Sequence, residues 1–512
     1  MLFNSYSFIF IFFPVVLLGY FRLGRVKISY ASAWLVLTSL FFYGYWNPAY
    51  LPLLLGSIVC NFSFGRWIAK AVITNRPQLQ KYLMGFGIAI NLVILGYYKY
   101  ANFFINNLNT AVGTDWNLGN IILPLGVSFF TFTQISFLVD TYQGKIKEYN
   151  FTHYALFVTY FPHLIAGPVL HHKEMMPQFD RTISYVVNWD NIATGLTIFI
   201  FGLAKKILIA DHLNEFVTPI FNAVSKGGHP MLFEAWVAAL AYTLQLYFDF
   251  SAYSNMAIGV SKMFNVQLPM NFDSPYKSKS IIEFWRCWHM TLSRFLRDYL
   301  YIPMGGNRNG SLNRYKNLML TMLLGGLWHG AGWTFLFWGG LHGVYLIINH
   351  LWINFRQHLK WTGKFHGAGF ITFIAVVVGW VFFRATDFAT ALNMLNGMAG
   401  LNGVSLNAGS SLVYTMSQHG IQLAGLMPLT KLNPGNAINI IVLAMLIVFI
   451  LPNLEEIMSA YQPSLTKKKK LTGIMSLLSW SPSLPHAATA LLLGYLVIGS
   501  LHKQSPFLYF QF

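Results

Sequence analysis

Charged residues are scarce in this sequence. Only 10% of the 512 residues are Asp, Glu, Lys or Arg, whereas 55% are hydrophobic. A soluble domain carries about 25% charged residues, so a chain this poor in charge is predicted to be a polytopic membrane protein. Cysteine is also nearly absent: Cys60 and Cys287 lie far apart in apolar or amphipathic segments. This spacing argues against a disulfide framework and against a cysteine metal site.

Several sequence motifs of known catalysts and pumps are missing as well. The chain contains no H-E-x-x-H zinc motif, no G-x-x-x-x-G-K-[ST] phosphate loop and no G-x-S-x-G elbow. We therefore expect no metal, no ATP-driven pump and no serine hydrolase of the elbow type. The net charge of +18 could indicate a nucleic-acid partner. In a membrane chain, basic cytoplasmic loops explain it more simply, so no nucleic-acid partner is expected.

Apolar stretches of roughly 20 residues, long enough to cross a bilayer, recur along the chain. We count eleven to thirteen and predict an all-α polytopic fold, as one transmembrane domain over 1–512. The longest weakly apolar stretch, 393–436, is predicted to be an extramembrane loop. The candidate segments are 6–23, 30–46, 50–69, 82–104, 119–139, 151–170, 191–210, 233–260, 317–328, 332–353, 370–389, 437–453 and 484–501.

One of these segments is predicted to be interrupted. The segment 151–170 contains Pro162, Gly167 and Pro168. Proline removes a hydrogen bond from the helical ladder, which a bilayer helix tolerates only with internal compensation. We therefore expect a re-entrant or broken segment here.

Polar residues concentrate between 245 and 343. Asp249 lies in an aromatic, apolar span, and an ionisable residue in such a place is a candidate for function. A structural pair with a buried Arg or Lys is an equally good interpretation of Asp249.

A second polar stretch, 281–298, is amphipathic if it is read as one helix. It is too charged to cross lipid alone, so it is expected to lie at an interface or to line a polar cavity. Arginines beside a histidine lower its pKa, and they also suit an anionic ligand. The predicted polar face comprises Arg286, His289, Ser293 and Arg297, widened by Glu283, Arg294 and Asp298, and the opposite face comprises Phe284, Trp285, Trp288, Leu292, Phe295 and Leu296.

Two histidines lie in the glycine-rich stretch LLGGLWHGAGWTFLFWGGLHG. His329 closes the segment 317–328 beside Trp328, and the glycines around it predict close packing against other helices. An isolated buried histidine is usually structural. The polar stretch upstream with His289 favours a functional site at His329, whereas His342 keeps a structural interpretation.

At this point the sequence resembles the membrane-bound O-acyltransferase (MBOAT) family. The similarity is carried by NFDSPYKSKSIIEFWRCWHMTLSRFLRDYLYIPMGGNR and by the tryptophan–histidine block around His329, and it extends to YFPHLIAGPV, YFDFSAYSNMAIG and both ends of the chain. It is closest to the bacterial branch that acetylates alginate. The resemblance implies a funnel-shaped membrane fold in which donor and acceptor tunnels meet at His329 and His289. Cys287 is a departure, because that branch often has an arginine there.

The implied activity is transfer of acetyl from cytoplasmic acetyl-CoA across the bacterial inner membrane to an exopolysaccharide. Alginate is the first candidate, and cellulose or another wall polymer the next. His329 would be the general base and His289 would orient or polarise the reacting groups. Arg286, Arg294, Arg297, Trp328 and Trp285 are candidate contacts of the donor, and Asp298 and Asp249 are further polar candidates. The resemblance also implies a partner of the SGNH hydrolase type within a polysaccharide synthesis complex.

Other functions remain open from the sequence. The interrupted segment around Pro162 and Pro168 is also found in transporters, so a transporter or flippase of acetyl groups or glycans is one alternative. Transporters often contain paired repeats with matching broken helices, and only one polar cluster is present here. A lipid, a protein or teichoic acid could also replace the polysaccharide as acceptor.

Overall fold

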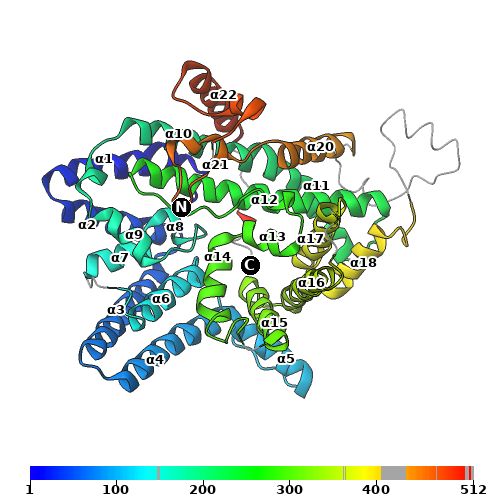
Figure 1. Cartoon of the computed structure of the whole chain (residues 1–512), viewed down its shortest axis with the longest axis horizontal. Coiled ribbons are helices and arrows are strands. Elements are labelled where there is room, and N and C mark those ends of the chain that lie inside the picture. Colours follow the sequence, from blue (N-terminus) through cyan, green and yellow to red (C-terminus); the bar gives the residue numbers. More distant parts are fainter. Residues whose placement is uncertain are drawn as a thin grey trace. The chain divides into compact units, whose positions relative to one another are not determined.

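The regular secondary structure of the described residues is all helical, as predicted (Figure 1), and the chain divides into two compact units. The computed structural model describes residues 1–146, 150–308, 310–360, 363, 365–404, 434–468, 470–501 and 507–508. The first unit comprises Met1–Leu203, Tyr253–Asn271 and Leu454–Lys503, and the second comprises Ala204–Ala252, Phe272–Asn453 and Gln504–Phe512. Most of the predicted loop 393–436 lies outside the described residues, apart from the end of one helix and the first residues of another.

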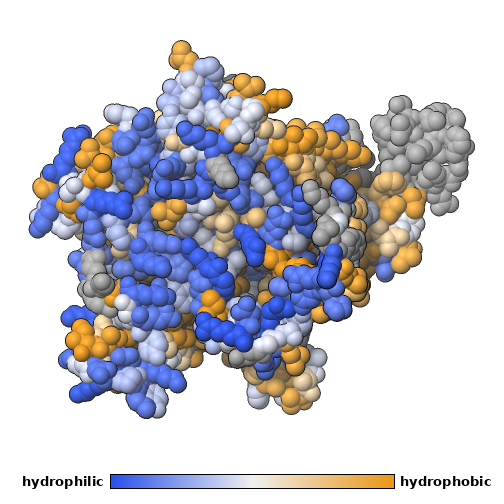
Figure 2. Space-filling model, viewed as in Figure 1, coloured by the Kyte–Doolittle hydropathy of each residue, from blue (hydrophilic) through white to orange (hydrophobic). Residues whose placement is uncertain are grey.

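The predicted apolar segments all overlap helices. Among the described residues, four helical runs are long and apolar enough to cross a membrane: Ser7–Val26, Pro48–Ile73, Pro77–Val112 and Trp189–Ser225. Shorter apolar helices cover Ile28–Gly44, Ala368–Arg384, Ala437–Ile450 and Leu484–Ser500. Their outer faces are strongly hydrophobic, as the surface over α20 (Pro434–Ile450) shows (Figure 2), where Val442, Leu443 and Leu446 are exposed. Exposed apolar surface of this kind is what a lipid-facing helix presents.

The first unit contains most of the N-terminal helices. They are η1 (Ser7–Phe12), α1 (Phe13–Val26), α2 (Ile28–Gly44), η2 (Pro48–Tyr50), α3 (Leu51–Ile73), α4 (Pro77–Leu95), η3 (Gly96–Tyr100), α5 (Ala101–Val112), α6 (Val127–Tyr142), α7 (Phe151–Thr159), α8 (Phe161–Leu164), α9 (His172–Phe179), η4 (Thr182–Tyr185) and α10 (Trp189–Ala204). The end of α12 and the elements α21 (Leu454–Ile457), η9 (Ser459–Tyr461), η10 (Gly473–Leu478) and α22 (Leu484–Ser500) complete it.

The predicted interruption at 151–170 is confirmed. Helix α7 ends at Thr159, α8 is a single turn, and the backbone from Ile165 to His171 is not helical. This irregular stretch is buried almost throughout. Non-helical backbone in a membrane protein requires such burial within protein.

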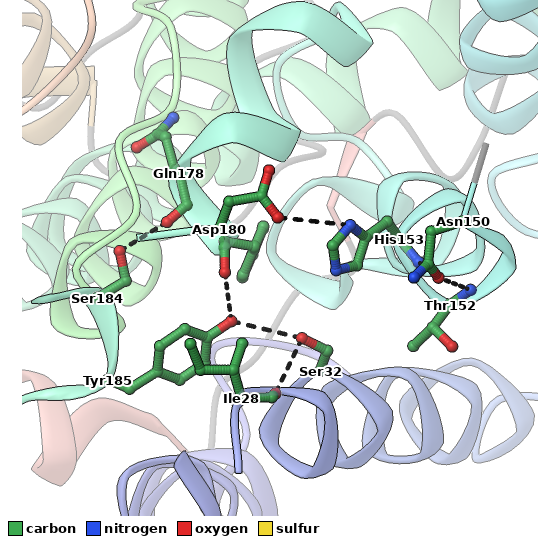
Figure 3. Close-up of polar contacts among 10 residues, drawn as sticks. Ile28, Ser32, Asn150, Thr152, His153, Gln178, Asp180, Ser184 and Tyr185 are labelled. Atoms are coloured by element: carbon green, nitrogen blue, oxygen red, sulfur yellow. Dashed lines mark hydrogen bonds and ion pairs between the residues drawn. The ribbon is translucent and has the colours of Figure 1, made fainter. Parts of the chain in front are cut away.

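Polar contacts fix the elements around the interruption (Figure 3). The Asn150 side chain caps α7 by accepting from the backbone amides of Thr152 and His153. His153 Nδ1 lies 3.7 Å from a carboxylate oxygen of Asp180, which follows α9. Ser184 Oγ donates to the carbonyl of Gln178 at 2.6 Å. Capping and side-chain contacts therefore fix α7 and the end of α9, the helices on either side of the interruption.

The second unit is built around an antiparallel pair of helices, α15 (Gly310–His329) and α16 (Trp333–His358). A Cβ built at Gly326 would lie 3.1 Å from Gly339 Cα, so the glycines allow the two backbones to approach closely, as predicted. The remaining helices are η5 (Lys205–Ala210), α11 (Asp211–Ser225), α12 (Leu232–Met263, shared with the first unit), η6 (Pro275–Lys277), α13 (Ile281–Cys287), α14 (Met290–Leu296), η7 (Arg297–Tyr301), α17 (Ala368–Arg384), α18 (Phe388–Met398) and α20.

The prediction of one continuous helix over 281–298 is wrong. Helix α13 ends at Cys287, Trp288 is extended, and His289 has a left-handed backbone with φ of 42° before α14 starts at Met290. No proline or glycine causes this break. Trp288 and His289 are both buried among aromatic rings, so we attribute the break to tertiary packing rather than local sequence. A left-handed non-glycine residue costs about 1–3 kcal/mol, and such residues cluster at functional sites.

Candidate active site

His329 is the last residue of α15 and is only 5% exposed. Its ring lies edge-on to two aromatic side chains, with centroid distances of 5.2 Å to Trp338 of α16 and 5.2 Å to Phe383 of α17. The chain turns immediately after His329, through Gly330 and Gly332. His329 therefore occupies the closed end of the α15–α16 pair, inside a wall of aromatic rings.

Trp328 contacts both of the histidines predicted to act together. Its ring centroid is 4.9 Å from that of His329 and 6.1 Å from that of His289, both at steep interplanar angles. The structure thus brings His289 and His329 to the same indole. The sequence placed these two residues on separate elements, and their proximity around Trp328 supports a single site.

His289 is fully buried, at the break between α13 and α14. It lies in none of the candidate membrane-crossing helices, and its ring packs edge-on against Phe250 of α12 at 4.7 Å. Burial lowers the pKa of His289 from 6.5 to about 3, so the neutral imidazole predominates. The sequence predicted this direction but attributed the lower pKa to neighbouring arginines, whereas the cause is desolvation by burial.

His342 and the predicted donor contact Trp285 belong to a neighbouring aromatic cluster. Trp285 Nε1 donates a hydrogen bond to His342 Nδ1 at 3.3 Å. Trp338 lies 4.9 Å from His342 and stacks on Trp380 at 5.5 Å. Trp285 therefore contacts His342 and Trp338, the indole that packs against His329.

The break at His289 separates Arg286 from Arg294 and Arg297, so the predicted polar face is not formed by one continuous helix. Arg286 and Arg297 are exposed, and Arg294 is partly buried. Arg297 Nε donates to the Asp298 carboxylate at 2.7 Å, so these two neighbouring candidates pair with each other. An exposed pair of this kind contributes little to stability.

Asp249 is paired, which was the structural alternative for this residue. Its carboxylate accepts from Lys206 Nζ at 2.6 Å, and Lys206 also contacts Asp211 at 2.8 Å. The backbone amide of Leu508, near the C-terminus, donates to the other carboxylate oxygen at 2.9 Å. The next residue of α12, Phe250, backs His289. Asp249 therefore links Leu508 to the part of α12 that packs against His289.

A cavity of about 1210 Å³ lies beside this cluster in the second unit. Its apolar lining includes Trp352, Phe373 and Phe449. Its polar lining includes the bases Lys277, Lys279, Arg356 and His366, and no Asp or Glu is among the described residues that line it. Tyr276 also lines it, and the ring of Tyr276 lies 6.0 Å from that of Trp288, the residue before His289. Tyr276 thus connects the cavity lining to the residue next to the buried histidine.

Sequence reasoning missed several residues of this region. Trp338, Trp380 and Phe383 pack against the buried histidines. Lys206 forms an ion pair with Asp249. Lys206 did leave a signal, since it is a lysine within an apolar segment close to Asp211. The aromatic residues left only a weak one: they lie in segments where aromatics are common, and only packing distinguishes these rings from others.

Comparison with known proteins adds an independent finding. The membrane-bound O-acyltransferase family matches residues 141–389. The chain is 45% identical over 434 residues to the peptidoglycan O-acetyltransferase of Helicobacter pylori, covering 79% of this chain and 81% of that one. It is 38% identical to the probable alginate O-acetylase of Pseudomonas aeruginosa over the full length of both chains. A teichoic acid D-alanyltransferase of Streptococcus thermophilus is 28% identical over 292 residues, 51% of this chain and 68% of that one.

Proposed function

Because the chain belongs to the membrane-bound O-acyltransferase family and is a multi-pass O-acyltransferase, we propose that it O-acetylates a cell-envelope polysaccharide. The observation that carries this proposal is that His329 and His289 both pack against Trp328. Peptidoglycan now stands beside alginate as acceptor, because the two relatives named for these polymers are similar over most or all of the chain. The inner membrane of a bacterium is the proposed location.

The proposed chemistry is a direct acyl transfer. His329 accepts the proton of an acceptor hydroxyl, whose oxygen attacks the thioester carbonyl of acetyl-CoA. The C–O bond of the ester forms, the C–S bond breaks, and the proton passes to the departing CoA thiolate. A positioned general base contributes about 10²–10⁴ to the rate. His289, neutral and buried, would orient the donor carbonyl or stabilise its developing negative oxygen.

We further propose that the donor binds in the cavity beside Tyr276. Acetyl-CoA combines a polyanionic nucleotide end with a thin acyl arm, and the cavity combines basic residues with an apolar lining. In this proposal Lys279 and Arg356 meet the phosphates, and the acyl arm passes Tyr276 to reach His289. The predicted donor contacts Arg286, Arg294 and Arg297 are outside the cavity lining.

The donor proposal has a direct test. We expect the double variant Lys279→Glu and Arg356→Glu to raise the KM for acetyl-CoA about tenfold or more, with little change in kcat. Arg297→Glu is the matched charge reversal outside the cavity and should leave KM near that of the parent protein. If Arg297→Glu raises KM and the double variant does not, the donor binds along α14 instead.

In this proposal the polymer lies on the outer side of the membrane, so the acetyl group must cross the bilayer during the transfer. We propose that a partner of the SGNH hydrolase type receives the acetyl group there and modifies the polymer within a polysaccharide synthesis complex. This arrangement would place the two substrates on opposite sides of the bilayer and the histidines between them.

The experiment that tests the function is replacement of His329 by alanine in cells that make the polymer. Ester-linked acetate on muramic acid and on uronic acid residues should be measured separately, because this comparison distinguishes peptidoglycan from alginate. We expect acetate to be lost from one of them. His486→Ala, at a membrane histidine of α22 in the first unit, is the matched control. Parental acetate on both polymers, with normal levels of the variant protein, would refute the role of His329.

A further inference from the structure

His342 is held in one orientation by a side chain from another element. It is fully buried in α16, and its Nδ1 accepts a hydrogen bond from Trp285 Nε1 of α13 at 3.3 Å. An indole N–H can only donate, so Nδ1 must be the acceptor, and the proton of the neutral imidazole is on Nε2. Such a hydrogen bond fixes both the tautomer and the plane of a histidine ring.

The same imidazole packs against the indole that contacts His329. The Trp338 ring is 4.9 Å from His342 and 5.2 Å from His329, and it is nearly perpendicular to the His329 ring, at 87°. Trp285 also touches Trp338 directly, at 5.8 Å. A continuous series of contacts therefore runs from Trp285 through His342 and Trp338 to His329.

Helix α17 packs against both His342 and Trp338. A Cβ built at Gly379 would lie only 2.9 Å from His342 Nε2 and 3.6 Å from Trp338 Cδ1. Trp380, the next residue, stacks on Trp338. His342 thus has no room to turn toward α17, and its orientation is set by Trp285 on one side and by the α17 backbone on the other.

We propose that His342 is a positioning residue for His329 and acts through Trp338. The Trp285–His342 hydrogen bond holds Trp338, and Trp338 holds the His329 ring in the plane that proton transfer requires. This inference rests on the proposed function, because it assumes that His329 is the base. Misplacement of a catalytic group by a fraction of an ångström lowers the rate of the chemical step, so loss of the hydrogen bond should lower kcat and leave donor KM unchanged.

Three substitutions test the inference in the full-length protein, reconstituted in vesicles and supplied with labelled acetyl-CoA. Trp285→Phe keeps an aromatic ring and removes the donor, whereas His342→Phe keeps a ring and removes the acceptor. We expect each to lower kcat for CoA release about tenfold, and the double variant to be no slower than the worse single variant. His342→Asn restores an acceptor near Nδ1 and should recover kcat to within about threefold of the parent protein.

Trp34→Phe is the matched control, since Trp34 Nε1 makes a hydrogen bond to the Val16 carbonyl in the first unit. It should leave kcat unchanged. Should His342→Phe fail to fold, Trp285→Phe still decides, because Trp285 is only partly buried. Parental kcat in Trp285→Phe, or losses that multiply in the double variant, would overturn the inference. CoA release that survives His329→Ala would instead refute the proposed function itself.

Discussion

Both units contain buried histidines at an interrupted helix, but different side chains surround the two interruptions. In the first unit, His163 Nε2 lies 3.0 Å from the Phe157 carbonyl, and His171 Nδ1 lies 3.8 Å from the Asp140 carboxylate. In the second unit, His289 and His329 pack edge-on against Phe250 and Trp338. The first interruption therefore combines polar contacts to its histidines with aromatic ones, such as Phe157 at 5.2 Å from His172, whereas His289 and His329 pack among aromatic rings.

The difference indicates separate roles for the two sets of histidines. A carbonyl or carboxylate interacts with the imidazole nitrogens, which are the atoms that proton transfer also needs. Aromatic contacts act on the edges and faces of the ring, so they fix its plane independently of the hydrogen bonds that its nitrogens make. We therefore expect substitutions in the first unit to affect mainly stability, and those in the second unit to affect mainly the rate.

The largest expected effect distinguishes His289 from His163. His289→Ala should lower kcat for acetyl transfer about 10²–10³-fold, the loss typical when one oxyanion-stabilising group is removed. His163→Ala should keep kcat within about threefold. It should lower the thermal stability, because an unsatisfied buried carbonyl costs about 1–3 kcal/mol.

The measurement is kcat together with the Tm of both purified variants. Equal losses of kcat would show that the polar and aromatic surroundings do not separate structural from catalytic histidines. A normal kcat in His289→Ala would remove His289 from the proposed mechanism.

A smaller effect is expected at the ion pair behind the aromatic wall. Asp249→Asn leaves buried Lys206 without one of its two carboxylates and weakens the anchor of the Leu508 amide. Removing one partner of a buried pair costs about 3–5 kcal/mol, so the Tm should fall by several degrees. Asp298→Asn breaks the exposed Arg297 pair and should change the Tm very little. Equal Tm values for the two variants would contradict the structural interpretation of Asp249.

The sequence was most informative where local rules decide the structure. Length and apolarity predicted the membrane helices, and Pro162 and Pro168 predicted the interruption after α7. These signals act within a few residues of the position that they affect. The glycines of the α15–α16 pair also predicted close helix packing, because the absence of a side chain lets another backbone approach, whichever helix it belongs to.

The sequence did not predict the features that depend on residues far away in the chain. The break at His289 has no local cause, because Trp288 and His289 are drawn from a helical path by rings of other elements. The predicted arginine stripe depended on that continuous helix, which the break divides. The pairing of Asp249 with Lys206 was one of two open alternatives, since a sequence does not show which buried charges meet.

The smallest expected effect concerns a polar cap in the second unit, outside the aromatic wall. Asp387 caps α18 by accepting from the Thr390 backbone amide at 2.7 Å, and this hydrogen bond lowers the pKa of the carboxyl group. Its stabilising effect is therefore complete above the pKa of the unfolded chain, near 3.9, and is lost as the pH falls through the lower pKa of the folded state. Asp387→Ala should cost about 1 kcal/mol at neutral pH and progressively less in acid, whereas Asp387→Asn keeps an uncharged cap. Tm values from pH 7 down to pH 3 check this, and a difference between the parent protein and Asp387→Ala that grew in acid would contradict it.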